Sequence, residues 1–225
     1  SEPKRLNKNI NTKYWEGSCS MSSDEQLLYF ASEKPGGFGG RDIYVSKKDD
    51  VGEWGPAVNI GPNINTPFND DAPFILSDGV TLFFSSEGHS SIGGYDIMYS
   101  SIKDDIWSTP TNMGYPLNTP EDERYYVLTA DGEKGYYSSD RKGTYGQQDI
   151  YMVTPGFTGQ KPVLALVLGF VTADDKPAGA SINVSNTETG EKTGSYESNS
   201  ATGKYIIALT PGNNYKIAFE VEGME

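Results

Sequence analysis

The sequence predicts an all-β protein, in which β-propeller blades are followed by a small Ig-like β-sandwich. Three observations lead to this fold class. The 225 residues include 26 glycines and 15 tyrosines, a composition typical of strands joined by tight turns. A pattern of about four strands recurs with a period of about 54 residues, as in propeller blades. After this pattern stops, short strand-like segments alternate with Gly- and Pro-containing turns.

The repeat is clearest at a strand that follows an Asp-containing turn. It aligns the segments 23–32, 77–86 and 130–139, which end in Ala-Ser, Ser-Ser and Ser-Ser. The same spacing relates Asp42, Asp96 and Asp149, each of which precedes an isoleucine. It also relates Trp54 to Trp107, and it aligns the Asn-Thr pairs at 11–12, 65–66 and 118–119. Matches at this many places in one register indicate a true structural repeat.

Each unit is expected to contain four strands. In the middle unit these are Pro73–Leu76, Thr81–Ser86, Asp96–Ser101 and a last strand that includes Trp107. The Asp78-Gly79 pair between the first two is a hairpin signal. Two units are complete and a third ends near residue 153, whereas a closed propeller typically needs about 4–8 blades. We therefore expect residues 1–153 to form a partial propeller truncated at its N-terminus, and two partial propellers could associate to complete a ring.

The second domain is expected at residues 163–225, after a linker at 154–162 that is rich in Gly and Pro. Its strands are predicted at 164–172, 179–186, 193–198, 204–209 and 215–221, which suits a small β-sandwich. We expect a final strand beyond Glu225, which would make this domain truncated at its C-terminus.

The pattern Leu-Ser-Asp-Gly-x-Thr-Leu-Phe-Phe-Ser-Ser, followed by Gly-Gly-Tyr-Asp-Ile, resembles WD40-like propeller repeats related to those of TolB. The segment from Gly169 to Gly212 is similar to carboxypeptidase regulatory-like domains. Together they resemble the middle of OmpA-family envelope lipoproteins of Bacteroidota, of the PorE type found in the type IX secretion system. The resemblance implies a non-enzymatic periplasmic scaffold at the outer membrane. Its partners would be envelope and secretion proteins, with peptidoglycan bound only through a domain absent from this chain.

Composition limits the other classes of function. The net charge of −13 argues against nucleic-acid binding. The sequence contains no apolar run of about 18 residues, so it predicts no membrane span. His89 is the only histidine and Cys19 the only cysteine, so no His/Cys metal site or Cys-His pair is expected. Calcium at Asp70 and Asp71 is less favoured than a turn between blades, and no cofactor is predicted. The main alternative function is that of a glycan- or peptide-binding module of an envelope protein. A propeller hydrolase is the third and least favoured class.

Residues that recur in every unit are expected to hold the fold. The carboxylates of Asp42, Asp96 and Asp149 should accept hydrogen bonds from the N–H groups of their own glycine-rich loops, and Trp54 and Trp107 should pack between blades. Cys19 is expected to be a buried, inert thiol. Partner binding would fall to loop residues that vary beside the repeated aspartate: Arg41, Tyr95, Gln147, Phe38, His89, Arg141 and Tyr145.

Overall fold

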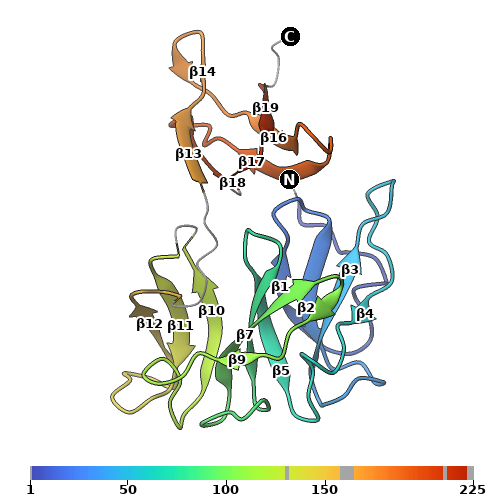
Figure 1. Cartoon of the computed structure of the whole chain (residues 1–225), viewed down its shortest axis with the longest axis vertical. Helices are drawn as coiled ribbons and strands as arrows, with labels where there is room; N and C mark the ends of the chain where they lie inside the picture. Colours follow the sequence, from blue (N-terminus) through green and yellow to red (C-terminus); the bar gives the residue numbers. More distant parts are fainter. Residues whose placement is uncertain (1, 130–131, 158–164, 210–211, 222–225) are drawn as a thin grey trace. The chain divides into compact units, whose positions relative to one another are not determined.

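The computed structural model describes residues 2–129, 132–157, 165–209 and 212–221, and all regular secondary structure in these residues is β (Figure 1). This confirms the predicted all-β fold class. The chain forms two compact units, one made of Ser1–Ser22 with Gln26–Gly159 and the other of Ser23–Glu25 with Gln160–Glu225.

The first unit contains three antiparallel sheets, here called blades 1, 2 and 3. Blade 1 has the order β1 (Glu16–Met21), β2 (Leu27–Ser32), β3 (Asp42–Lys47) and β4 (Val58–Asn59). Blade 2 contains β5 (Asp70–Ile75), β6 (Thr81–Ser86) and β7 (Asp96–Lys103), with both β8 (Ile106–Trp107) and β9 (Thr111–Asn112) paired to β7. Blade 3 consists of β10 (Glu123–Leu128), β11 (Gly135–Ser139) and β12 (Asp149–Val153).

The first strand of each blade carries a β-bulge at the same repeat position. Ser18, Ala72 and Tyr125 have φ values of 51°, 51° and 59°, and the strand register shifts at each of these points. A bulge re-aims the side chains on either side of it. The residues just before the bulge in blades 2 and 3, Asp71 and Arg124, meet in the site described below.

Two hydrophobic cores hold the three blades together. Tyr29 and Ile43 of blade 1 pack with Leu82, Phe84 and Met98 of blade 2. The alternate side chains of blade 2, including Phe83 and Ile97, pack with Tyr126 and Tyr137 of blade 3. Because side chains alternate along a strand, blade 2 buries both of its faces, and all six residues of β6 are buried.

Trp107 lies in the core between blades 1 and 2, whereas Trp54 packs on a separate cluster of blade 1. Trp107 is buried and meets the ring of Tyr29 edge-on, with ring centroids 6.3 Å apart. Trp54 is half-buried against the cluster of Leu28, Phe30 and Tyr44 in blade 1. The prediction that each blade has one outer strand containing the tryptophan is wrong. Trp54 forms an isolated bridge to Lys48, and Trp107 belongs to the short β8, whereas β4 and β9 follow each tryptophan and pair with the third strand.

Phe157 takes the place of a tryptophan in blade 3. Its buried ring meets Phe83 edge-on at a centroid distance of 5.1 Å, and Phe83 lies 54 residues after Tyr29, the partner of Trp107. The N–H of Gly156 also donates a hydrogen bond to the carbonyl of Glu133. Residues 154–157, expected as the start of a linker, thus pack against the blades. The rest of that linker, 158–162, lies outside the described residues.

Cys19 is exposed, so the expectation of a buried thiol is wrong. Its counterpart in blade 2, Pro73, is buried because β5 has the first strands of two blades beside it, β1 and β10. Among the described residues, β1 has such a neighbour only in β5. The difference follows from the position of the blade and not from the residue.

The second unit is a small β-sandwich. One sheet pairs β13 (Ala165–Phe170) with β18 (Lys204–Leu209), and the other has the order β17 (Lys192–Glu197), β16 (Ser181–Asn186), β19 (Tyr215–Glu220). A short hairpin joins β14 (Thr172–Ala173) to β15 (Lys176–Pro177). Ile182, Val184 and Ile207 are fully buried between the two sheets.

Candidate functional site

The glycine-rich loop between the second and third strands of each blade is organised by the repeated aspartate. Oδ2 of Asp42, Asp96 and Asp149 accepts a hydrogen bond from the N–H four residues earlier, at 2.7, 2.6 and 2.6 Å. Asp42 Oδ1 accepts a further bond from Gly39 at 3.1 Å. A Cβ at Gly37 would lie 1.5 Å from Asp42 Oδ2, so the loop can close on the carboxylate only with glycine there.

Asp96 is fully buried, and burial raises the pKa of its carboxyl group against the hydrogen bonds from Ile92, Asn112 and Gly93, which lower it. Asn112 Nδ2 donates to Asp96 Oδ2 at 2.6 Å, as Asn59 Nδ2 does to Asp42 Oδ2 at 3.2 Å. The aspartate thus ties its loop to the outer strand of the same blade.

The Asn-Thr pairs link each blade to the next. Asn65 accepts from the N–H of Ile43 at 2.7 Å and donates to its carbonyl at 2.9 Å, so the amide continues the hydrogen bonding of β3. Asn118 does the same with Ile97 in blade 2. The adjacent threonine instead binds a carboxylate on the first strand of the following blade.

These carboxylates form a second repeated set that the sequence reasoning missed. They are Glu16, Asp70 and Glu123, each four residues after the repeated threonine. Each accepts from the N–H and hydroxyl groups of its threonine and from the serine that ends the second strand. The signal in the sequence was Thr-x-x-x-Asp/Glu at the repeat spacing. Asp70, half of the acidic pair considered for calcium binding, therefore holds a blade in place.

The other half of that pair, Asp71, joins all three blades. Its Oδ2 lies 2.6 Å from Nη1 of Arg41 in blade 1 and 2.6 Å from Nη2 of Arg124 in blade 3. The Asp71 side chain is 0% exposed. Burial disfavours its charged form, but hydrogen bonds from Arg41, the N–H of Ala72 and Ser18, with the Arg41 charge, outweigh this and lower its pKa. We call Arg41, Asp71 and Arg124 the three-blade junction.

Aromatic rings cover the arginines of this junction. The Arg41 guanidinium lies 3.9 Å from the ring centroid of Trp15, and that of Arg124 lies 4.1 Å from Tyr95. Tyr95 is buried, which raises the pKa of its hydroxyl group to about 12. Arg41 also pairs with Glu33 at 2.7 Å. Arg41 and Tyr95, both suggested as partner contacts, are thus engaged in packing the blades.

Two other suggested contacts are also engaged within the fold. His89 Nε2 lies 2.7 Å from the carbonyl oxygen of Ile64, and its ring packs edge-on against Phe84. Arg141 donates to the carbonyl oxygen of Leu117 at 2.6 Å and to Glu123 at 3.1 Å. Both side chains therefore connect neighbouring blades.

The remaining candidates, Phe38, Tyr145 and Gln147, are exposed. Gln147 does not share the repeat position of Arg41 and Tyr95, because the residue directly before Asp149 is Gln148. Phe38 and Tyr145 do share a position with each other and with Ile92, which the sequence reasoning missed. All three donate the backbone N–H that binds the repeated aspartate. Their side chains are 48%, 50% and 103% exposed for Phe38, Ile92 and Tyr145 respectively.

Tyr14 and Phe68 add two further exposed apolar side chains at the same end of the blades. They share a repeat position just before the first strand, and backbone contacts such as the bridge between Arg41 and Asn69 place these segments beside the glycine-rich loops. We call the five residues the loop-end surface: Tyr14, Phe38, Phe68, Ile92 and Tyr145. Carboxylates of Glu33, Glu121 and Asp140 are exposed in the same connections.

Neither a metal centre nor a membrane helix emerges from the part of the chain that the structure describes. No group of three or more His, Cys, Asp or Glu residues there is arranged to hold a metal ion. No helix in the same residues has the length and apolar character needed to cross a bilayer.

The fold and site define a partial β-propeller joined to a β-sandwich. No family model and no curated protein matches the chain. Similar solved structures include TolB from Acinetobacter baumannii (14% identity, TM-score 0.42, 96% of this chain and 43% of that chain) and a putative TolB from Agrobacterium tumefaciens (11%, 0.43, 95% and 60%). Prolyl oligopeptidase B from Galerina marginata is also similar (14%, 0.41, 95% and 27%). The chain spans less than two thirds of each of these proteins.

Proposed function

We propose that this chain is a non-enzymatic scaffold that binds other proteins through the loop-end surface. One observation carries the proposal: Phe38, Ile92 and Tyr145 recur at one repeat position, are apolar in every blade, and remain exposed. Most other repeated residues are engaged in hydrogen bonds or packing that hold the blades. An apolar side chain fixed at a rigid loop, and not used in the core, is typical of a protein-binding surface.

The partner is expected to carry apolar and basic side chains. The loop-end surface places aromatic and aliphatic groups among exposed carboxylates, and the whole chain has a net charge of −13. Opposite charges on the partner would speed encounter, while burial of the apolar side chains would supply most of the affinity. Raising the salt concentration should therefore lower the association rate constant more than it lowers the affinity.

The cellular setting is part of the same proposal. The resemblance to TolB-related repeats followed by a regulatory-like domain supports a periplasmic protein associated with the outer membrane in a type IX secretion system. Its partners would then be other envelope and secretion proteins, and peptidoglycan would be bound through a domain outside this chain. A scaffold with a rigid propeller and a separate sandwich suits that role.

The test is a comparison of two triple variants as baits in envelope extract from a bacterium with a type IX system. The first changes Phe38, Ile92 and Tyr145 to serine. The matched control changes three exposed apolar residues outside the loop end, Val58, Val80 and Ile106, to serine. We expect the wild type and the control to capture the same secretion proteins, quantified by mass spectrometry, and the loop-end variant to lose them. Equal capture by all three baits would contradict the proposal.

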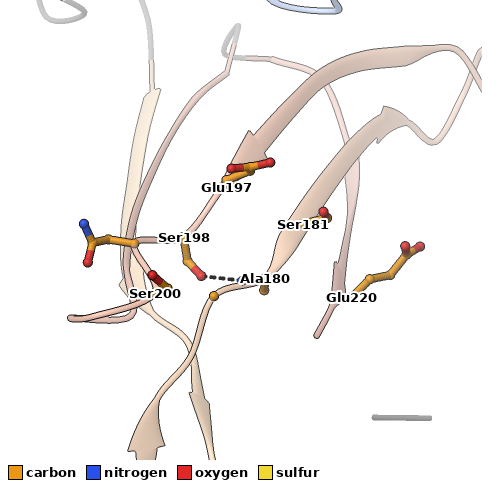
Figure 2. A pocket seen from close by; sticks show the side chains of 8 residues that line it. Ala180, Ser181, Glu197, Ser198, Ser200 and Glu220 are labelled. Atoms are coloured by element: carbon orange, nitrogen blue, oxygen red, sulfur yellow. Dashed lines mark hydrogen bonds between the residues drawn. The ribbon is translucent and has the colours of Figure 1, made fainter. Parts of the chain in front are cut away.

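A second candidate function is glycan binding by the sandwich. A groove of about 460 Å³ in this unit is lined mainly by hydroxyl, amide and carboxylate groups (Figure 2). Ser181 lies opposite Glu197 on one side and Glu220 on the other, so the three residues form a row across β17, β16 and β19. Such groups can hydrogen-bond a hydroxyl-rich ligand. A glycan array would test this, with Glu197→Ala and Glu220→Ala, which remove the hydrogen-bonding groups, expected to abolish any signal.

A further inference from the structure

Blade 3 exposes an apolar row on one of its faces. Val127, Tyr136, Ile150 and Met152 lie on its three strands and are 45%, 37%, 80% and 56% exposed. Large apolar side chains that align on one sheet face are unusual at a protein surface unless another element covers them. The row is distinct from the loop-end surface, because it lies along the strands of the blade.

The repeat shows what covers such a row. The residues 53 positions earlier, in blade 2, are Phe74, Phe83, Ile97 and Tyr99, and blade 3 packs against them. Phe83 and Ile97 are both 0% exposed there. The open face of blade 3 is therefore the same face by which blade 2 receives its neighbour, so its natural occupant is another blade.

Blade 1 offers the complementary face. Met21, which is 47% exposed, corresponds to Ile75 of blade 2, which packs in the core shared with blade 1 and is 4% exposed. Leu28, Phe30 and Tyr44 follow on the same face and are 7%, 2% and 3% exposed, because Ile10 and Trp54 pack on them. In the core between blades 1 and 2, Ile64 and Trp107 hold the same repeat positions, and blade 1 packs beside them. Blades 3 and 1 thus carry the two kinds of face that meet between neighbouring blades of this chain.

We propose that blade 3 is covered by blade 1 of a second copy of this chain, and that the reciprocal contact closes a ring of six blades. Three blades cannot close, whereas six lie within the range of about 4–8 seen in propellers. Two-fold pairing uses the same contact twice and covers both the apolar row of blade 3 and Met21 of blade 1, as expected of a closed symmetric dimer. The groove of about 150 Å³ lined by the three first strands would then form one side of the central channel.

The mass of the full chain in solution tests the proposal. Light scattering coupled to size exclusion should give twice the chain mass of 24.5 kDa. Ile150→Glu and Met21→Glu should each yield monomers, since both faces are needed, while Ile92→Glu at the loop end should remain dimeric. Circular dichroism and tryptophan fluorescence should be unchanged in all three, because the substituted side chains are already about half exposed or more.

Mixing the two interface variants adds a test of which faces meet. The Met21→Glu copy keeps an intact blade 3 and the Ile150→Glu copy keeps an intact blade 1, so the mixture should regain pairing that neither variant shows alone. A monomeric wild type at about 100 μM would overturn the proposal. So would a Met21→Glu variant that still dimerises, because that result would mean that blade 3 pairs with blade 3. Neither result would bear on partner binding by the loop-end surface.

Discussion

Replacing Asp71 by asparagine should destabilise the blades more than the same replacement at any exposed carboxylate. The substitution keeps the shape of the side chain but removes the negative charge that both Arg41 and Arg124 contact at 2.6 Å. Because these arginines come from blades 1 and 3, the change loosens all three blades at once. The bulge at Ala72 fixes the backbone here, so the side chain has little freedom to move away from the mismatch.

The expected loss is worked from the contacts. Each hydrogen bond to a charged group contributes about 1.5–3 kcal/mol, and a buried charge left without its partner costs about 3–5 kcal/mol. The arginine side chains are 22% and 17% exposed, so water can partly replace the carboxylate. Asparagine can also still accept one hydrogen bond. We therefore expect a loss of about 2–3 kcal/mol, which lowers Tm by about 5–10 °C for a unit of this size.

Tryptophan fluorescence during thermal unfolding is a suitable assay. All three tryptophans lie in the first unit, so the signal reports the blades and not the sandwich. Asp50→Asn, at an exposed turn, is the matched control and should change Tm by less than about 2 °C. If the Asp71→Asn variant has the same Tm as the wild type, the proposed role of the three-blade junction is refuted.

Three further predictions concern the same unit. Asp96→Ala should cost about 1–3 kcal/mol because it leaves the N–H of Ile92 and the amide of Asn112 without their acceptor, and an unchanged melting temperature would contradict this. Phe157→Ala should cost about 3–5 kcal/mol by leaving a cavity between blades 2 and 3, measured by urea unfolding, whereas a loss below about 1 kcal/mol would place Phe157 in a linker. The pKa of Asp71 is lowered in the folded state, so its stabilising contribution is complete above its unfolded pKa of about 4 and is lost as pH falls through the folded value. The difference in stability between wild type and Asp71→Asn should therefore be constant near neutral pH and shrink below about pH 4; a difference that grows on acidification would reverse the sign.

The repeat made much of the fold predictable. A residue needed in every blade appears once per unit, so spacing alone identified Asp42, Asp96 and Asp149 as residues that bind their own loops. That interaction spans four residues, and local hydrogen bonding of this kind can be read from sequence. The strands themselves followed from hairpin turns and apolar runs, with bounds that shifted by a few residues.

Contacts between blades were harder to predict. Arg41 and Asp71 are 30 residues apart, and only the packing of blade 1 on blade 2 brings them together. Asp71 stands at a position that holds Gly17 and Arg124 in the other blades, so the repeat gave no hint of an ion pair. Phe157 escaped notice because it lies three residues short of the position that Trp107 predicts. Four residues looked like variable surface positions: Arg41, Tyr95, His89 and Arg141. They differ between blades because each makes different packing contacts with the neighbouring blade.

The central claim is that the repeated apolar side chains of the loop-end surface serve binding and not folding. The most direct test measures both properties in the variant that changes Phe38, Ile92 and Tyr145 to serine. The account predicts a Tm within about 2 °C of the wild type, since exposed side chains contribute little to stability, together with loss of the captured envelope proteins. A Tm lowered by many degrees with capture unchanged would contradict it.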